Sequence, residues 1–207
     1  MRRLLNAAKR GDREGLRKII NSRADLETRD NKGNTALIWA TVKGCMHCVQ
    51  LLIDAKASIE ARNSFCHTPL TMAAQGGHAD CVQLLFDANA DINARAIEGS
   101  SALVWAAINP HPECAQRVID LEADLEFKNM NGNTALLCAA IVGSGESMQR
   151  LVNANAALDA TDNHGGTALM HAVRRGHPAS VRLILELACD VFSTRTSKKP
   201  KLRQGDK

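Results

Sequence analysis

The stretch GNTALIWA at residues 33–40 returns almost unchanged as GNTALLCA at residues 132–139, 99 positions later. Related stretches occur at residues 66–73, 99–106 and 165–172, so the spacing between neighbouring copies is always 33 residues. Self-similarity at a fixed period of this size is typical of proteins built from stacked structural repeats. The spacing therefore predicts the architecture before any single residue is considered.

Each copy has the same internal order: a hydroxyl residue, then Ala or Pro, then Leu, and three residues later Ala. The hydroxyl residues are Thr35, Thr68, Ser101, Thr134 and Thr167, and the later alanines are Ala40, Ala73, Ala106, Ala139 and Ala172. Five copies in one register exclude coincidence. Ala7, Ala8 and Gly11 continue the series backwards as a sixth, shortened copy.

The residues of one copy predict a helix, a turn and a second helix. Thr or Ser before Ala or Pro is a typical N-cap followed by a good first-turn residue. A glycine follows in most copies, at Gly44, Gly77, Gly143 and Gly176, where a helix would end. Apolar segments such as CVQLLIDA (48–55) and CVQLLFDA (81–88) then predict the second helix, and a polar stretch leads to the next copy.

The segment HTPLTMAAQGGHADCVQLLFDANADINAR (67–95) resembles an ankyrin repeat at nearly every signature position, and the resemblance extends over residues 2–194. It implies an all-α, ankyrin-repeat solenoid of stacked helix–turn–helix units with projecting loops. The expected organisation is one domain at 1–194, followed by a basic, disordered tail at 195–207. The six repeats would cover 1–29, 30–62, 63–95, 96–128, 129–161 and 162–194.

The sequence departs from the family where a left-handed residue, usually Gly, follows the second helix. That place is held by Lys56, Asn89, Glu122, Asn155 and Ala188. Asn tolerates the left-handed region, whereas this backbone conformation is less stable by roughly 1 kcal/mol for a residue such as Lys, Glu or Ala. We therefore expect a less rigid array than an idealised one.

Charge and composition exclude several classes of protein. The net charge of +4 combines +5 in residues 1–29, +5 in residues 195–207 and −6 between them, so no basic stripe crosses the centre of the chain. A nucleic-acid binder would carry one, and we expect no nucleic acid as a partner. No apolar run is long enough to span a membrane and the N-terminus does not read as a signal peptide, so we expect an intracellular protein with its seven cysteines as free thiols.

The side chains that could carry chemistry are better explained by structure. CMHC (45–48) has the spacing of metal ligands, but no second pair completes a zinc site, and Cys48 falls in one column with Cys81 and Cys114. His78, His111 and His177 recur at one place between the two helices, where the family uses His structurally. No phosphate-binding, nucleophile-elbow or zinc-protease motif is present. We expect no catalytic residues, no bound metal and no cofactor.

Function must then lie in the positions that vary between copies. The family resemblance implies a concave surface formed by the loop tips and the ends of the first helices, and there we expect a protein partner to bind. The residues expected to contact it are Phe65, Ile97, Met130, Ile108, Ile141, Val142, Lys32, Val42, Lys43, Arg174 and Arg175. Exposed apolar side chains in a group mark interaction sites. The alternative is that some of them pack on the adjacent loop.

The preferred interpretation is a non-catalytic adaptor or scaffold in the cytoplasm. A nuclear regulatory ankyrin protein is the alternative, because KKPKLR (198–203) resembles a nuclear localisation signal through Lys198, Lys199, Lys201 and Arg203. The chain could also be one module of a larger signalling protein. The last repeat, with SVRLILELACDVF (180–192), is apolar on its outer side, so the protein is expected to be a monomer or to self-associate weakly through this repeat.

Overall fold

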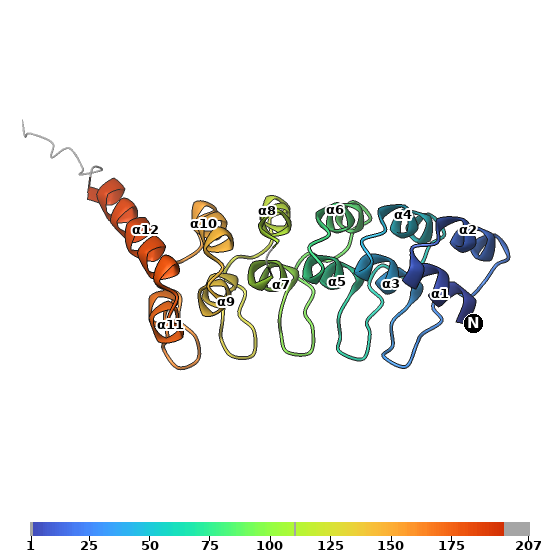
Figure 1. Cartoon of the computed structure of the whole chain (residues 1–207), viewed down its shortest axis with the longest axis horizontal. Coiled ribbons are helices and arrows are strands. Elements are labelled where there is room, and N and C mark those ends of the chain that lie inside the picture. Colours follow the sequence, from blue (N-terminus) through green and yellow to red (C-terminus); the bar gives the residue numbers. More distant parts are fainter. Residues whose placement is uncertain (1, 110, 197–207) are drawn as a thin grey trace, which may run out of the picture.

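The computed structural model describes residues 2–109 and 111–196, and these residues form twelve α-helices in six consecutive pairs. The first helices of the pairs are α1 (Arg2–Arg10), α3 (Ala36–Val42), α5 (Pro69–Gln75), α7 (Ala102–Ile108), α9 (Ala135–Val142) and α11 (Ala168–Arg175). The second helices are α2 (Arg13–Asn21), α4 (Met46–Asp54), α6 (Ala79–Asp87), α8 (Pro112–Asp120), α10 (Gly145–Asn153) and α12 (Pro178–Thr196). Figure 1 shows two layers of helices, with the connecting loops projecting beyond the layer of first helices. The predicted all-α solenoid is confirmed.

The hydroxyl column caps the first helices as predicted. The side chain of Thr35 accepts a hydrogen bond from the backbone N–H of Ile38, and the same bond recurs in the next four repeats. The glycine that ends the helix has a positive φ, for example 64° at Gly44 and 79° at Gly143. Both ends of α3, α5, α9 and α11 are therefore set by residues that the 33-residue period repeats, whereas α7 ends at an extended Asn109.

The left-handed residue after the second helix is present in four of the five predicted places. Lys56, Asn89, Glu122 and Asn155 have φ values of 67°, 67°, 59° and 69°. The prediction for Ala188 is wrong, because α12 continues through it for 19 residues in all. Ala favours a helix and disfavours the left-handed region by roughly 1 kcal/mol. The helix reaches Thr196, two residues into the segment predicted as tail; residues 197–207 lie outside the described residues.

The core runs along the stack as columns of equivalent residues. The alanines Ala40, Ala73, Ala106, Ala139 and Ala172 are all fully buried, as are the cysteines of the second helices, Cys48 and Cys114. Burial raises the pKa of the Cys48 thiol to about 12, with a further contribution from Cys45. Cys48 is thus an apolar packing residue, as predicted for CMHC.

The recurring histidines connect neighbouring repeats. The Nε2 atom of His78 lies 3.2 Å from the carbonyl oxygen of Val42, and that of His177 lies 3.1 Å from the carbonyl oxygen of Ile141. Each ring rests on the glycine of the preceding repeat, where a Cβ atom on Gly44 or Gly143 would overlap it. The predicted structural role of these two histidines is confirmed.

A carboxylate or amide oxygen organises each projecting loop but one. In the loop before α3, Asp30 Oδ1 accepts the backbone N–H groups of Lys32 and Asn34 at 2.9 and 3.0 Å. The equivalent acceptors are Asn63, Asn129 and Asp162. In the repeat at 96–128 the position is Ala96, which has no acceptor.

The loop with Ala96 leaves a neighbouring donor unsatisfied. Trp39 Nε1 donates to Asp30 Oδ2 at 2.8 Å, whereas the equivalent Trp105 Nε1 is buried and has no hydrogen-bond partner among the described residues. An unpaired buried donor costs about 1–3 kcal/mol. This loop is therefore less well stabilised than its neighbours.

Replacing Ala96 with Asp should stabilise the protein by about 1 kcal/mol, because the new carboxylate can accept hydrogen bonds from the backbone of Glu98 and Ser100 and from Trp105 Nε1. Urea unfolding followed by circular dichroism measures the change. In a Trp105→Phe background the gain should be smaller, since the indole donor is gone. A lower unfolding midpoint for Ala96→Asp would contradict this explanation.

The two loop aspartates also make stability depend on pH. For Asp30, burial alone would raise the pKa, but hydrogen bonds from the Asn34 backbone and from Trp39 lower it from 3.8 to about 2. Backbone hydrogen bonds from Gly166 and His164, assisted by His171, lower the pKa of Asp162 from 3.8 to about 2. A lowered pKa means that the folded state prefers the ionised group.

Their stabilising contribution should be complete above about pH 5 and decline as the pH falls from there towards about 2, because the unfolded chain takes up the protons first. The control is Asp30→Asn with Asp162→Asn, since Asn occupies the same place in two other loops. This variant should be less stable at neutral pH and lose less stability on acidification. If the free energy of unfolding in urea falls equally with pH in wild type and in this variant, the two aspartates are not the cause of the pH dependence.

Candidate protein-binding surface

Successive loops are joined by backbone hydrogen bonds near their tips. The N–H of Ile97 donates to the carbonyl of Phe65 at 2.9 Å, and the N–H of Met130 donates to the carbonyl of Glu98 at 3.1 Å. The same bond, between residues 32 apart, joins Ser64 to Lys32 and Asn163 to Asn131. The loops therefore form a continuous ladder across five repeats, and their tips are held in a fixed arrangement.

Three large apolar side chains stand exposed on this ladder. Phe65 is 50% exposed, Ile97 is 55% exposed and Met130 is 70% exposed. They come from three consecutive loops that are bonded to one another, so they form one group, which we call the loop-tip patch (Phe65, Ile97 and Met130). These side chains are not buried against the adjacent loops. Contiguous apolar surface of this kind marks interaction sites.

Aromatic side chains support one end of the loop-tip patch. The ring of Phe65 lies 6.5 Å from that of His67, and His67 lies 5.6 Å from the indole of Trp105. Burial lowers the pKa of His67, which favours the neutral form of its ring. Phe65 is therefore supported by tilted aromatic contacts to buried His67 and, through it, to half-buried Trp105.

The predicted residues at the helix ends divide into two groups. Val142 and Lys43 are exposed, whereas Val42, Ile108 and Ile141 are half-buried. The carbonyl groups of Val42 and Ile141 face the histidines of the following repeats, and Ile108 packs against the core. These three residues therefore have a structural role in addition to any exposed contact area.

The basic residues lie at the two ends of the row of loops. Lys32 stands exposed on the loop before α3, and Arg174 and Arg175 are exposed at the end of α11. The loop-tip patch comes from the loops between these repeats. The surface thus has an apolar centre and a cationic residue at each end.

A chain of hydrogen bonds orients Arg174. The Nε2 atom of His171 lies 2.8 Å from Asp162 Oδ2, and its Nδ1 atom lies 2.9 Å from the Arg174 guanidinium. Because the carboxylate only accepts, Nε2 carries the hydrogen and Nδ1 of the neutral ring accepts from Arg174. The loop aspartate therefore positions a predicted contact residue through His171.

Neither this chain of hydrogen bonds nor the column of loop acceptors was predicted from the sequence. The acceptors Asp30, Asn63, Asn129 and Asp162 do recur every 33 residues and could have been found from that spacing. A second undetected feature is a row of cations at the base of the loops. Arg62 donates to the carbonyl of Arg95 at 2.9 Å, and Lys128 donates to that of Thr161 at 2.7 Å.

The described residues contain neither a metal-binding cluster nor a membrane-spanning helix. Over residues 2–109 and 111–196, no three His, Cys, Asp or Glu side chains are grouped so that they could hold a metal ion. Cys45 is half-buried at the start of α4, and His47 is exposed on that helix. Within the same ranges, no helix combines the length and apolarity needed to cross a bilayer. The targeting residues predicted at 198–203 lie outside the described part of the chain.

Comparison with known proteins agrees with the repeat architecture. The family model described as ankyrin repeats (3 copies) matches residues 4–96 and again residues 98–195. A search of curated protein sequences finds no significant match. Many solved structures are similar.

Three solved structures illustrate the similarity. An ankyrin repeat domain from Acinetobacter baumannii AYE is 29% identical, with a TM-score of 0.78 over 89% of this chain and 97% of that one. The ankyrin repeat protein EF0377 is 25% identical, with a TM-score of 0.80 over 89% and 96%. The ankyrin repeat domain of Bcl-3, a member of the IkappaB protein family, is 25% identical, with a TM-score of 0.81 over 89% and 85%.

The family model covers nearly all of the described residues, and the helix pairs, most helix caps and the loop ladder recur with the same period of 33 residues. The chain belongs to the ankyrin-repeat family.

Proposed function

We propose that this protein is an adaptor that binds a protein partner along the concave surface formed by its loop tips and the ends of its first helices. Ankyrin repeats are in general protein–protein interaction modules, and their fold is in general a non-catalytic scaffold. The observation that carries the proposal is the loop-tip patch, three exposed apolar side chains on hydrogen-bonded consecutive loops.

The physical basis for binding is preorganisation. The loops are fixed to one another in the free protein, so little backbone entropy is lost when a partner binds. Burying one large apolar side chain contributes about 1.5–3 kcal/mol. The patch therefore has the properties of a binding hot spot, with rigid support below it.

The charges indicate the chemistry of the partner. Lys32 and Lys43 lie on the second repeat, and Arg174 and Arg175 on the sixth, on either side of the apolar centre. A complementary partner presents an apolar segment with acidic residues at one or both ends. Opposite charges at the rim of such a complex mainly increase the association rate and the specificity.

The double substitution Phe65→Ser and Met130→Ser should weaken capture of the partner by about tenfold or more, because two anchors of the loop-tip patch are removed. The thermal unfolding midpoint should change little, since both side chains are exposed. Affinity capture from the source cell, quantified for wild type and variant, measures the effect.

Met46→Ser is the matched control, because Met46 is also exposed but lies on α4, away from the loops. It should leave capture unchanged. If the double variant unfolds at a much lower temperature, the two side chains belong to the core. If it captures the same proteins as wild type, the partner binds elsewhere.

We further propose that the protein resides in the cytoplasm and enters the nucleus through the basic string KKPKLR at 198–203, which would make it a nuclear regulatory ankyrin protein. Short basic strings of this kind read as nuclear localisation signals.

Deleting residues 198–203 should abolish nuclear accumulation of a fluorescent fusion while leaving the unfolding midpoint unchanged, because these residues follow the repeats. The counter-test fuses residues 194–207 to an unrelated fluorescent protein, which should then accumulate in the nucleus. A distribution that the deletion does not alter would leave only the cytoplasmic adaptor.

A further inference from the structure

The last repeat exposes a surface that is covered in the repeats before it. Met170 is 61% exposed, although Ile38, Thr71 and Leu137 at the same position of earlier repeats are fully buried. Val173 is 60% exposed, whereas its earlier equivalents are buried completely: Thr41, Ala74, Ala107 and Ala140. The difference arises because a following pair of helices covers each earlier repeat, as α11 and α12 cover α9 and α10.

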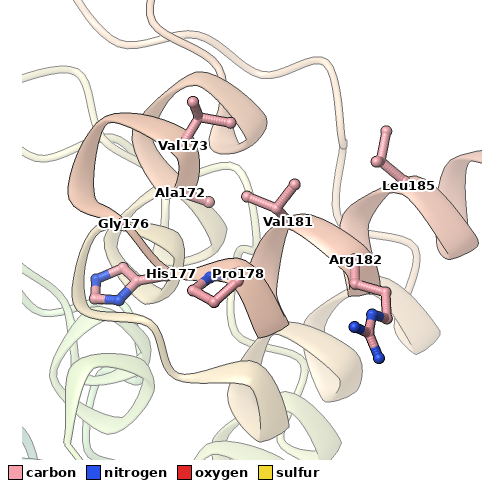
Figure 2. A pocket seen from close by; sticks show the side chains of 8 residues that line it. All are labelled: Ala172, Val173, Gly176, His177, Pro178, Val181, Arg182 and Leu185. Carbon is pink, nitrogen blue, oxygen red and sulfur yellow. The ribbon is translucent and has the colours of Figure 1, made fainter.

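This surface is shaped as a shallow apolar hollow between α11 and α12. Figure 2 shows Val173 of α11 and Leu185 of α12 on either side of Val181, with His177 and Pro178 beside them. Leu185 is 50% exposed. We call Met170, Val173, Val181 and Leu185 the C-terminal end face. Helix α12 forms one wall of this face and has 19 residues, whereas α10 in the preceding repeat has 9.

We propose that the C-terminal end face binds an amphipathic helix of a protein partner, one that has a stripe of Ala and Leu bordered by acidic residues. The helical form follows from continuity with the interfaces inside the array. The equivalent face of every earlier repeat contacts the helices of the next one, as α9 contacts α11 and α10 contacts α12. Those covering helices contribute small and apolar residues to the common core, such as Ala168 and Ile184.

The acidic border follows from the charges around the face. Arg182 lines the hollow and lies beside Leu185 in Figure 2, and Arg174 and Arg175 are exposed on α11. Glu186, four residues after Arg182 on α12, is an exposed carboxylate. A complementary helix therefore carries Glu or Asp beside its apolar stripe.

Two other occupants fit this chemistry less well. A second copy packed tail to tail would bring the arginines of both copies together, and like charges across an interface are unfavourable. The segment at 197–207 is itself strongly basic, with Lys198, Lys199 and Lys201 among its residues. Its charge would be repelled by Arg182 as well. The weak self-association expected from the sequence is thus the competing outcome of the test.

The test uses the full chain and two fluorescent helical peptides of about 18 residues, long enough to form a helix when bound. Both have the same stripe of Ala and Leu; one has Glu on its borders and the other Lys. Fluorescence anisotropy at about 50 and about 500 mM NaCl gives the affinities. The Glu peptide should bind about tenfold more tightly than the Lys peptide at low salt, and the preference should shrink at high salt.

Three variants assign the binding to this face. Val173→Ser with Leu185→Ser should weaken the Glu peptide about tenfold with little change in unfolding temperature, since both side chains are exposed. Arg182→Gln should keep the binding but reduce the preference for Glu over Lys. The variant Phe65→Ser with Met130→Ser should bind the peptide as wild type does, which separates this face from the loop-tip patch.

Several results would overturn the proposal. These are no binding of either peptide, equal binding of both, or a loss of binding only in the loop-tip variant. If the variant Val173→Ser with Leu185→Ser does not fold, Arg182→Gln still tests the proposal. An unchanged preference for the Glu peptide over the Lys peptide in Arg182→Gln would contradict it. Sedimentation of the wild type as a dimer that Arg182→Gln strengthens would instead identify the face as a contact between two copies.

Discussion

Burial of each repeat against the next is the constraint on which the rest of this structure depends. A pair of helices as short as α3 and α4 cannot form a core by itself, so its apolar surface is covered by the repeats before and after it. The fully buried alanines of the first helices allow the helices to approach closely, and a larger side chain there would separate neighbouring repeats. Stability is therefore a property of the stack, shared among neighbours.

Polar contacts between neighbours fix how the repeats are rotated and how the loops project. His78 and His177 each connect the start of a second helix to the end of the first helix in the preceding repeat, and backbone hydrogen bonds connect successive loops. Such contacts have direction, whereas apolar burial alone has little. Because of them the loop tips carry Phe65, Ile97 and Met130 at fixed places. A variable surface on a fixed frame fits the proposed adaptor function.

Much of the fold could be predicted because it is local and repeated. The N-cap at Thr35, the left-handed Gly44 and the buried Cys48 each follow from one residue and its neighbours in the chain, and the period tests each of them several times. Ala188 shows the limit of that reasoning. The same register position is a turn in four earlier repeats, and here the helix continues, since nothing in the described stack requires the chain to reverse after it.

The candidate site was predicted less completely. The exposed loop residues were identified from the pattern, but the chain from Asp162 through His171 to Arg174 joins groups whose distances no repeat pattern contains. Half-burial of Ile108, Val42 and Ile141 likewise depends on the neighbouring repeat. By itself the sequence determined the repeat, its helices and the variable positions, because these follow from local propensity and periodicity. Only the tertiary structure decided which apolar residues stay exposed and which charges surround them, because exposure depends on whether another repeat lies against the surface.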